Sequence, residues 1–162
     1  AQSPVNGHEY MTSVDIGRRQ DATVINTFDI TRRPYQRVAH QRFEGIPYPL
    51  IQQHIERRWQ SYGGELHIES NGVGDPVIEN LTVPVKPFVT TAKSKLRGIQ
   101  ALQLLLEQRA IKARWTAQER KEFTLYKWDD RDLTQDCVMS LAIGAARLAE
   151  SDQSVSFVTR YR

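Results

Sequence analysis

The stretch Tyr10-Met11-Thr12-Ser13-Val14-Asp15-Ile16-Gly17 decides the fold. It predicts a buried β-strand over residues 10–16 that carries a carboxylate at its end, just before a turn-forming glycine. A carboxylate at the end of a buried element is costly unless it is paired or bound to a cation. Two more acids stand at such ends: Glu69 closes the apolar segment 65–68, and Asp136 opens the apolar stretch 137–143. Three such acids, far apart in sequence, predict convergence on hard ions such as Mg²⁺ or Mn²⁺.

Further elements follow outward from this strand. The β-rich run 22–30 and the segment 35–43 come after short turns, so residues 10–43 predict an antiparallel three-strand meander. Helices and strands then alternate. Apolar spacing and capping residues predict helices at 49–62, 75–81, 93–108, 116–126 and 133–149, with strands at 65–69, 83–89 and 111–115. This order predicts an α/β fold with a mixed sheet and helices on both faces.

The composition is that of an ordinary globular chain. Its 162 residues, 40% hydrophobic and 25% charged, fit one domain over 1–162 with a core at about 10–150. The lead-in before residue 10 and the tail after 150 are expected to lie outside that core. No apolar run approaches the roughly 20 residues of a membrane span, and no signal peptide is visible. The single Cys137 excludes an internal disulfide and a cysteine-rich zinc site, and suits a reducing cytoplasm.

Basic residues gather in short groups, at 18–19, 32–33, 57–58, 93–97 and 120–121. The net charge of +3 permits binding to nucleic acid without requiring it. Taken singly, each group is typical of a solvated turn or helix face. Two groups flank the predicted acids, however, and we expect their side chains to hold a DNA backbone: Arg18, Arg19, Lys93 and Lys95.

The acids fall into a familiar layout. In a sheet led by such a meander, the first strand can lie beside the fourth, which places Asp15 next to Glu69 with Asp136 above them. This is the layout of the ribonuclease H-like nucleases, and from about residue 11 to 149 the chain resembles the nuclease domain of phage terminase large subunits. The matching motifs are Asp15-Ile16-Gly17, Ile68-Glu69 with Asn71-Gly72-Val73-Gly74, Thr91-Ala92-Lys93-Ser94-Lys95 and Asp136-Cys137-Val138-Met139-Ser140-Leu141-Ala142. The family often has two adjacent acids at the start of its last helix. Here Gln135 replaces the first, and an acidic pair occurs earlier, at Asp129 and Asp130.

The resemblance implies an endonuclease that cuts double-stranded viral DNA during genome packaging, in the cytoplasm of an infected bacterium. It implies two Mg²⁺ or Mn²⁺ ions, with Asp15 bridging both and with Glu69 and Asp136 each holding one. The implied partners are double-stranded DNA, an N-terminal ATPase domain, the portal and the small terminase subunit. The chain lacks the Gly-x-x-x-x-Gly-Lys-Ser/Thr phosphate loop, so we expect no nucleotide cofactor in it. That absence and the start at Ala1 without methionine predict an excised C-terminal domain.

Each acid also has a purely structural interpretation, which stays open. An aspartate before glycine is often only a turn former, and an acid at a helix start is favoured by the helix dipole. Asp21, Asp129 and Asp130 are candidate additional ligands, but loop acids of this kind are more often simply solvated. The rival functions are a Holliday-junction resolvase, an RNA–DNA hybrid hydrolase, an actin-like ATP-binding domain and a non-catalytic DNA-binding or assembly module.

Overall fold

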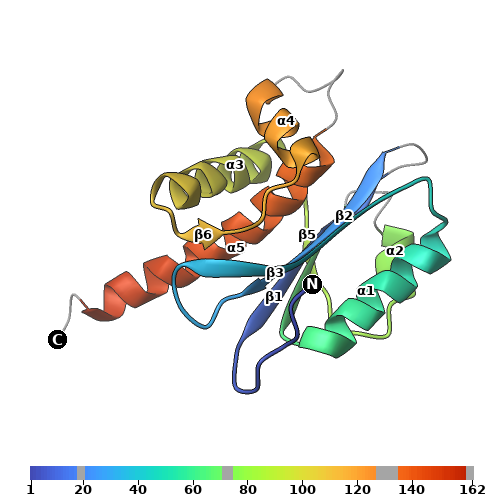
Figure 1. Ribbon diagram of the computed structural model, residues 1–162, viewed down its shortest axis with the longest axis horizontal. Coiled ribbons are helices and arrows are strands. Elements are labelled where there is room, and N and C mark those ends of the chain that lie inside the picture. The colour runs from blue at the N-terminus through green and yellow to red at the C-terminus, as the bar shows by residue number, and fades with distance from the viewer. Residues whose placement is uncertain (18–20, 71–74, 127–134, 160–162) are drawn as a thin grey trace.

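A computed structural model of the chain describes residues 1–17, 21–70, 75–126 and 135–159. These residues contain a six-stranded sheet in the order β5-β4-β1-β2-β3-β6 (Figure 1). The strands are β1 (Tyr10–Asp15), β2 (Ala22–Asp29), β3 (Tyr35–Glu44), β4 (Glu65–Glu69), β5 (Lys86–Phe88) and β6 (Ile111–Lys112). Strands β1, β2 and β3 pair antiparallel, whereas β4 runs parallel to β1, β5 to β4 and β6 to β3. The predicted meander and the placement of the first strand beside the fourth are both confirmed.

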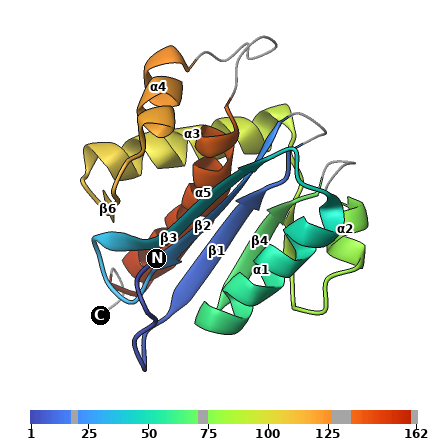
Figure 2. The same cartoon turned by 45° about the vertical axis from the view of Figure 1, so that its right-hand side comes forward.

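Helices cover both faces of this sheet, as predicted. One face carries α1 (Tyr48–Tyr62) and α2 (Asp75–Glu79), and the other carries α3 (Ala92–Glu107), α4 (Ala117–Leu125) and α5 (Asp136–Thr159) (Figures 1 and 2). In the part of the chain that the structure describes, none of these helices has the length and apolar character needed to cross a bilayer.

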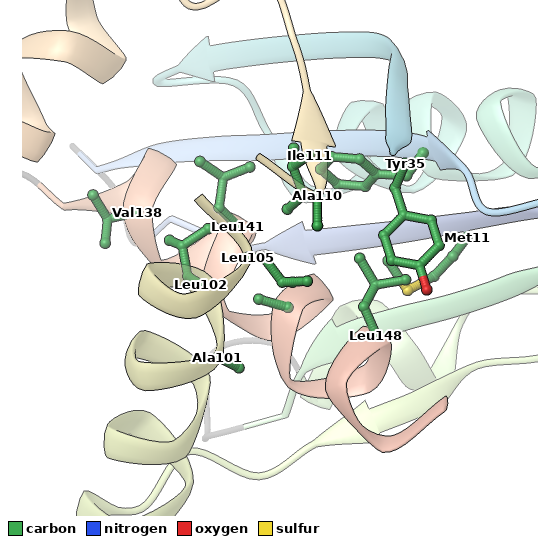
Figure 3. Close-up of a cluster of buried hydrophobic side chains, with 12 residues drawn as sticks. Met11, Tyr35, Ala101, Leu102, Leu105, Ala110, Ile111, Val138, Leu141 and Leu148 are labelled. Atoms are coloured by element: carbon green, nitrogen blue, oxygen red, sulfur yellow. The ribbon is translucent and has the colours of Figure 1, made fainter. Parts of the chain in front are cut away.

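Alternating side chains divide each strand between two cores. Met11 and Phe28 join the cluster between the sheet, α3 and α5, which Figure 3 shows with Leu102, Leu105 and Leu141. Val14, Ile25, Leu66 and Ile68 instead pack against the buried α1 residues Ile51 and Ile55. Because successive side chains of a strand point to opposite faces, residues 11, 13 and 15 of β1 and residues 65, 67 and 69 of β4 face α5.

Helix α5 lies very close to β1. A Cβ atom at Gly144 would stand 3.1 Å from Ser13 Oγ and 3.2 Å from Met11 Cε, so a larger residue there would push the helix away from the sheet. One helical turn earlier, Asn26 Nδ2 of β2 donates a 3.0 Å hydrogen bond to Ser140 Oγ. These contacts fix how far α5 lies from the sheet and where it lies along the strands, and therefore the place where the helix begins.

The structure differs from the sequence expectations at several boundaries. The strand expected at 111–115 ends at Lys112, and the helix expected at 75–81 ends at Glu79. Helix α5 continues to Thr159, so the predicted end at Ala149 is wrong, because the polar residues 150–154 include no proline or glycine that would stop a helix. The strand expected at 83–89 shortens to Lys86–Phe88, because Pro84 before it and Pro87 within it cannot donate to a sheet ladder. The lead-in has no regular structure, but it is tied down: Gln2 N–H donates to Val38 O over 2.8 Å.

Candidate active site

Two of the three predicted acids meet across neighbouring strands. The parallel register pairs Val14 of β1 with Ile68 of β4, so the next residues, Asp15 and Glu69, end their strands side by side on the face covered by α5. Asp15 is buried, at 7% exposed, and its side chain shares a hydrogen bond with Glu69. Two carboxyl groups can share such a bond only when one of them carries the proton.

The surroundings of Asp15 oppose its ionisation. Burial raises the pKa of this carboxyl group well above its ordinary value, and the nearby negative charges of Glu69, Asp136 and Glu122 raise it further. A buried acid that is surrounded by other acids gains most from a cation that neutralises the whole group. The structure thus places Asp15 within the electrostatic reach of both other predicted ligands.

Asp136 supplies the third carboxylate from the first residue of α5. Its Oδ2 accepts a 3.2 Å hydrogen bond from Ala22 N–H at the start of β2 and stands 3.9 Å from Arg42 Nη2. Burial raises the pKa of Asp136 to about 6, and the charges of Glu122 and Asp21 add to the rise, while the Ala22 hydrogen bond and Arg42 oppose it. The metal-free group is therefore partly protonated near pH 6.

The start of α5 is held by α4, which the sequence interpretation missed. Glu122 Oε2 accepts hydrogen bonds from the N–H groups of Cys137 at 2.9 Å and Val138 at 3.1 Å, so a carboxylate from another helix occupies the positive end of the α5 dipole. Helix α4 begins with a capping box between Thr116 and Glu119. No spacing in the sequence links Glu122 to α5, because only tertiary packing brings them together.

Arg42 is a second residue that the sequence interpretation missed. Asp15 pairs with Val24 and Val24 pairs with Arg42, so the three residues stand opposite one another on β1, β2 and β3 and share the face toward α5. The guanidinium of Arg42 contacts Glu44 as well as Asp136, and its side chain is 22% exposed. Alternation along residues 35–43 does not assign Arg42 to this face, because the pairing of β2 with β3 shifts register between Thr27 and Phe28, so that Tyr35 and Phe43 pack in different cores.

The donor chemistry fits hard divalent ions. Carboxylate oxygens are the ligands that Mg²⁺ and Mn²⁺ prefer, and a buried acid whose pKa is raised, as that of Asp15 is, is stabilised when a cation displaces its proton. Among the residues that the structure describes, however, no three His, Cys, Asp or Glu side chains already surround one point as ligands of a single ion. Asp15 and Glu69 are in contact, whereas Asp136 is turned to Ala22 and Arg42.

The remaining predicted site residues are placed as follows. Asp21 is exposed and lies close enough to Asp136 to affect its charge. In the first turn of α3, Lys93 is exposed and Lys95 is half-buried. Thr90 stands just before this helix, and its Oγ1 donates a 2.6 Å hydrogen bond to Glu69 Oε1. Arg18, Arg19, Asp129, Asp130 and the motif 71–74 lie outside the described residues.

No protein-family model matches this sequence, and no curated protein is significantly similar to it. Solved structures do match. The large terminase nuclease from thermophilic phage G20c with bound magnesium has a TM-score of 0.78 at 22% identity, over 90% of this chain and 84% of that one. The large terminase nuclease domain of Thermus phage P74-26 has a TM-score of 0.72 at 18% identity, over 88% and 80%. A large terminase from another thermophilic bacteriophage, in complex with ADP, has a TM-score of 0.68 at 13% identity, over 89% of this chain and 42% of that one.

These matches establish the fold. The chain has the ribonuclease H-like fold of terminase nuclease domains, which confirms the predicted fold class. The G20c nuclease has also been solved with bound zinc and with bound cobalt, so divalent metals bind to that neighbour. The expected roles of individual residues in the present chain stay predictions.

Proposed function

We propose that this chain is a Mg²⁺- or Mn²⁺-dependent endonuclease that cuts double-stranded DNA during viral genome packaging, in the cytoplasm of an infected bacterium. The observation that carries the proposal is the position of Asp15. It is a buried acid at the end of a central strand, in contact with Glu69 and within the field of Asp136. Together with a fold shared with terminase nucleases, this acidic group favours metal-assisted phosphodiester hydrolysis.

Each residue has a defined part in the proposed site. Asp15, Glu69 and Asp136 would hold two divalent ions, with Asp15 shared between them. When bound, such ions activate water and stabilise the charge that develops on the leaving oxygen. Thr90 holds Glu69 in place through its 2.6 Å hydrogen bond, and Ala22 N–H does the same for Asp136.

Cationic side chains would bind the DNA beside these acids. Arg42 is near enough to Asp136 to turn toward a phosphate oxygen once cations take over the neutralisation of that carboxylate. Lys93 and Lys95 in α3, with Arg18 and Arg19 after β1, would contact backbone phosphates without reading the base sequence.

The proposed setting is a packaging motor. The neighbour solved in complex with ADP is a large terminase, and the present chain covers 42% of its length. We infer by analogy that this chain works beside an N-terminal ATPase domain, with the portal and the small terminase subunit as further partners. The nucleotide would bind to that ATPase domain, since this chain has no phosphate loop.

The test is nicking and linearisation of supercoiled plasmid in Mn²⁺ and in Mg²⁺. Asp15→Asn and Asp136→Asn should each reduce the cleavage rate by roughly 100-fold or more while circular dichroism stays unchanged, because loss of a direct ligand costs at least as much as loss of an outer one. Glu56→Gln is the matched control, because Glu56 is a carboxylate that bonds to Thr82, away from the acids. Cleavage at the wild-type rate in both aspartate variants would refute the proposed site.

A panel of substrates separates the rival nucleases. We expect linear duplex to be cut as readily as a four-way junction, and an RNA–DNA hybrid to be cut more slowly. A strong preference for the junction would identify a resolvase instead, and a preference for the hybrid would identify an RNA–DNA hybrid hydrolase. Anomalous scattering from crystals soaked in Mn²⁺ gives an independent answer, with two peaks expected between Asp15, Glu69 and Asp136.

A further inference from the structure

A polar hollow lies at the opposite end of the sheet from the acids. It measures 240 Å³ and is lined by three separate parts of the chain: His8 from the lead-in, Asp29, Arg32 and Arg33 from the end of β2 and the turn that follows it, and Lys112 from β6. Asp29 pairs with Tyr10, which stands five residues before Asp15 on β1. At the usual strand rise this places the hollow about 17 Å from the carboxylates.

Positive charge dominates this hollow. Its lining includes three cations, Arg32, Arg33 and Lys112, against the single carboxylate of Asp29. The turn is short and β6 pairs with the start of β3, so the backbone brings these like charges close together. Within the described residues, neither Arg32 nor Lys112 forms an ion pair with an acidic side chain. Like charges gathered in this way repel one another until an anion binds between them.

The one acid in the hollow is already engaged. Asp29 Oδ1 accepts hydrogen bonds from Thr31 N–H at 3.0 Å and from Thr31 Oγ1 at 2.6 Å, and Oδ2 lies 2.5 Å from His8 Nδ1. Both carboxylate oxygens are therefore occupied by groups other than the three cations. Asp29 orients the imidazole of His8 and shapes the turn, and the charges of Arg32 and Lys112 stay available to a ligand.

The second arginine is held in position. The Arg33 guanidinium lies 5.6 Å from the centre of the Tyr35 ring, and its Nη1 is 3.5 Å from Gln108 Oε1. A guanidinium that rests on an aromatic ring loses less freedom when it binds an anion. The fork of an arginine matches two oxygens of a phosphate group, and a lysine ammonium adds a point charge from the side.

We propose that this hollow, lined by His8, Arg32, Arg33 and Lys112, is a phosphate-binding site separate from the acidic site. Phosphate groups match it in charge, in oxygen geometry and in the number of donors that converge on it. The favoured source is the backbone of a DNA duplex, which would then be held about 17 Å from the point of cleavage. A free phosphate compound shares the same chemistry, so the experiment includes both sources.

The effect on DNA binding can be estimated. Each phosphate contact contributes about 0.9 to the slope of log binding constant against log salt concentration. Arg32→Glu and, separately, Lys112→Gln should each lower that slope by about 1 and weaken binding several-fold at about 50 mM salt. Arg57→Glu on α1 is the matched control for Arg32→Glu, because both arginines are exposed and both changes alter the net charge equally.

Binding is measured on the full chain by fluorescence anisotropy with a duplex of about 30 base pairs in EDTA, so that the outcome does not depend on cleavage or on the metal site. Calorimetry with inorganic pyrophosphate tests the second source. Loss of duplex binding in the two hollow variants, with none in Arg57→Glu, supports a DNA site. Loss of the heat of pyrophosphate binding in the two hollow variants, with duplex binding unchanged, supports a site for a small phosphate compound. Variants that match the wild type in both assays, or a control that loses as much as they do, overturn the proposal.

Discussion

Replacing Asp136 by asparagine should stabilise the metal-free protein while it destroys the proposed activity. Burial and nearby acids raise the pKa of Asp136 from its ordinary 3.8 to about 6. The folded state therefore favours the protonated form, and the stability linked to this group is fully present below about pH 4 and is lost as the pH rises through about 6. An asparagine can still accept the hydrogen bond from Ala22 N–H, but it carries no charge that the neighbouring acids repel.

The size of the effect follows from the shift in pKa. A rise from 3.8 to about 6 corresponds to about 3 kcal/mol of lost stability once the group is ionised. The Asp136 side chain is 16% exposed and Arg42 is nearby, so solvent and the guanidinium reduce the repulsion. We expect Asp136→Asn to be more stable than the wild type by about 1–2 kcal/mol at pH 8, or about 3–6 °C in Tm.

The assay is thermal and urea unfolding in EDTA at a series of pH values from about 4 to about 8. The stability difference should be near its minimum at the acid end of this range and should grow as the pH rises to about 6. Adding Mn²⁺ should raise the Tm of the wild type and leave that of Asp136→Asn nearly unchanged, because a ligand stabilises only the state that binds it. A difference that does not vary with pH, or an asparagine variant that is less stable at pH 8, would refute this reasoning.

Three further predictions concern the scaffold around the site. Gly64 has a φ of 75° and an added Cβ would lie 1.9 Å from Tyr10 O, whereas Gly45 has a φ of 62° and open space around it. Gly45→Ala should therefore lower the free energy of unfolding in urea by about 1–2 kcal/mol, and Gly64→Ala should lower it by several kcal/mol more. Equal losses in the two variants would contradict the packing. Arg37→Ala should lower the free energy of unfolding by about 3–5 kcal/mol, because it leaves the buried carboxylate of Glu119 without its guanidinium partner. Replacing both Arg37 and Glu119 by apolar residues should lower it by less than that. Glu122→Gln should lower the pKa of Asp136 below about 6 in an NMR titration, since it removes a negative charge, and an unchanged pKa would show that Glu122 does not act on Asp136.

Local sequence patterns were sufficient to predict the sheet and the acids that end its strands. The β-rich run 22–30 and the short turns on either side dictated the meander, and a helix between residues 43 and 65 allowed β4 to return parallel to β1. Once those strands are neighbours, alternation alone places Asp15 and Glu69 on one face. Periodicity of this kind can be recognised without any knowledge of contacts between distant residues.

The residues that escaped prediction are those whose position depends on packing between elements. Arg42 reaches Asp136 through the register of β2 against β3, and Glu122 reaches the start of α5 through the docking of one helix on another. Neither contact has a sequence spacing that could reveal it. The end of α5 was misplaced for a different reason: a polar stretch was interpreted as a boundary, although polarity alone does not break a helix.

The pairing of β1 with β4 has a consequence for how the site can change. The two strands are locked by backbone hydrogen bonds and by apolar side chains on both faces, so the separation of Asp15 and Glu69 is inherited from the fixed distance between adjacent chains, about 4.8 Å. The sheet thus sets the spacing between the two acids that end its strands. Substitutions can alter their charge or their reach, but only a slip of the ladder could change the interval, and a one-residue slip would turn either acid to the wrong side.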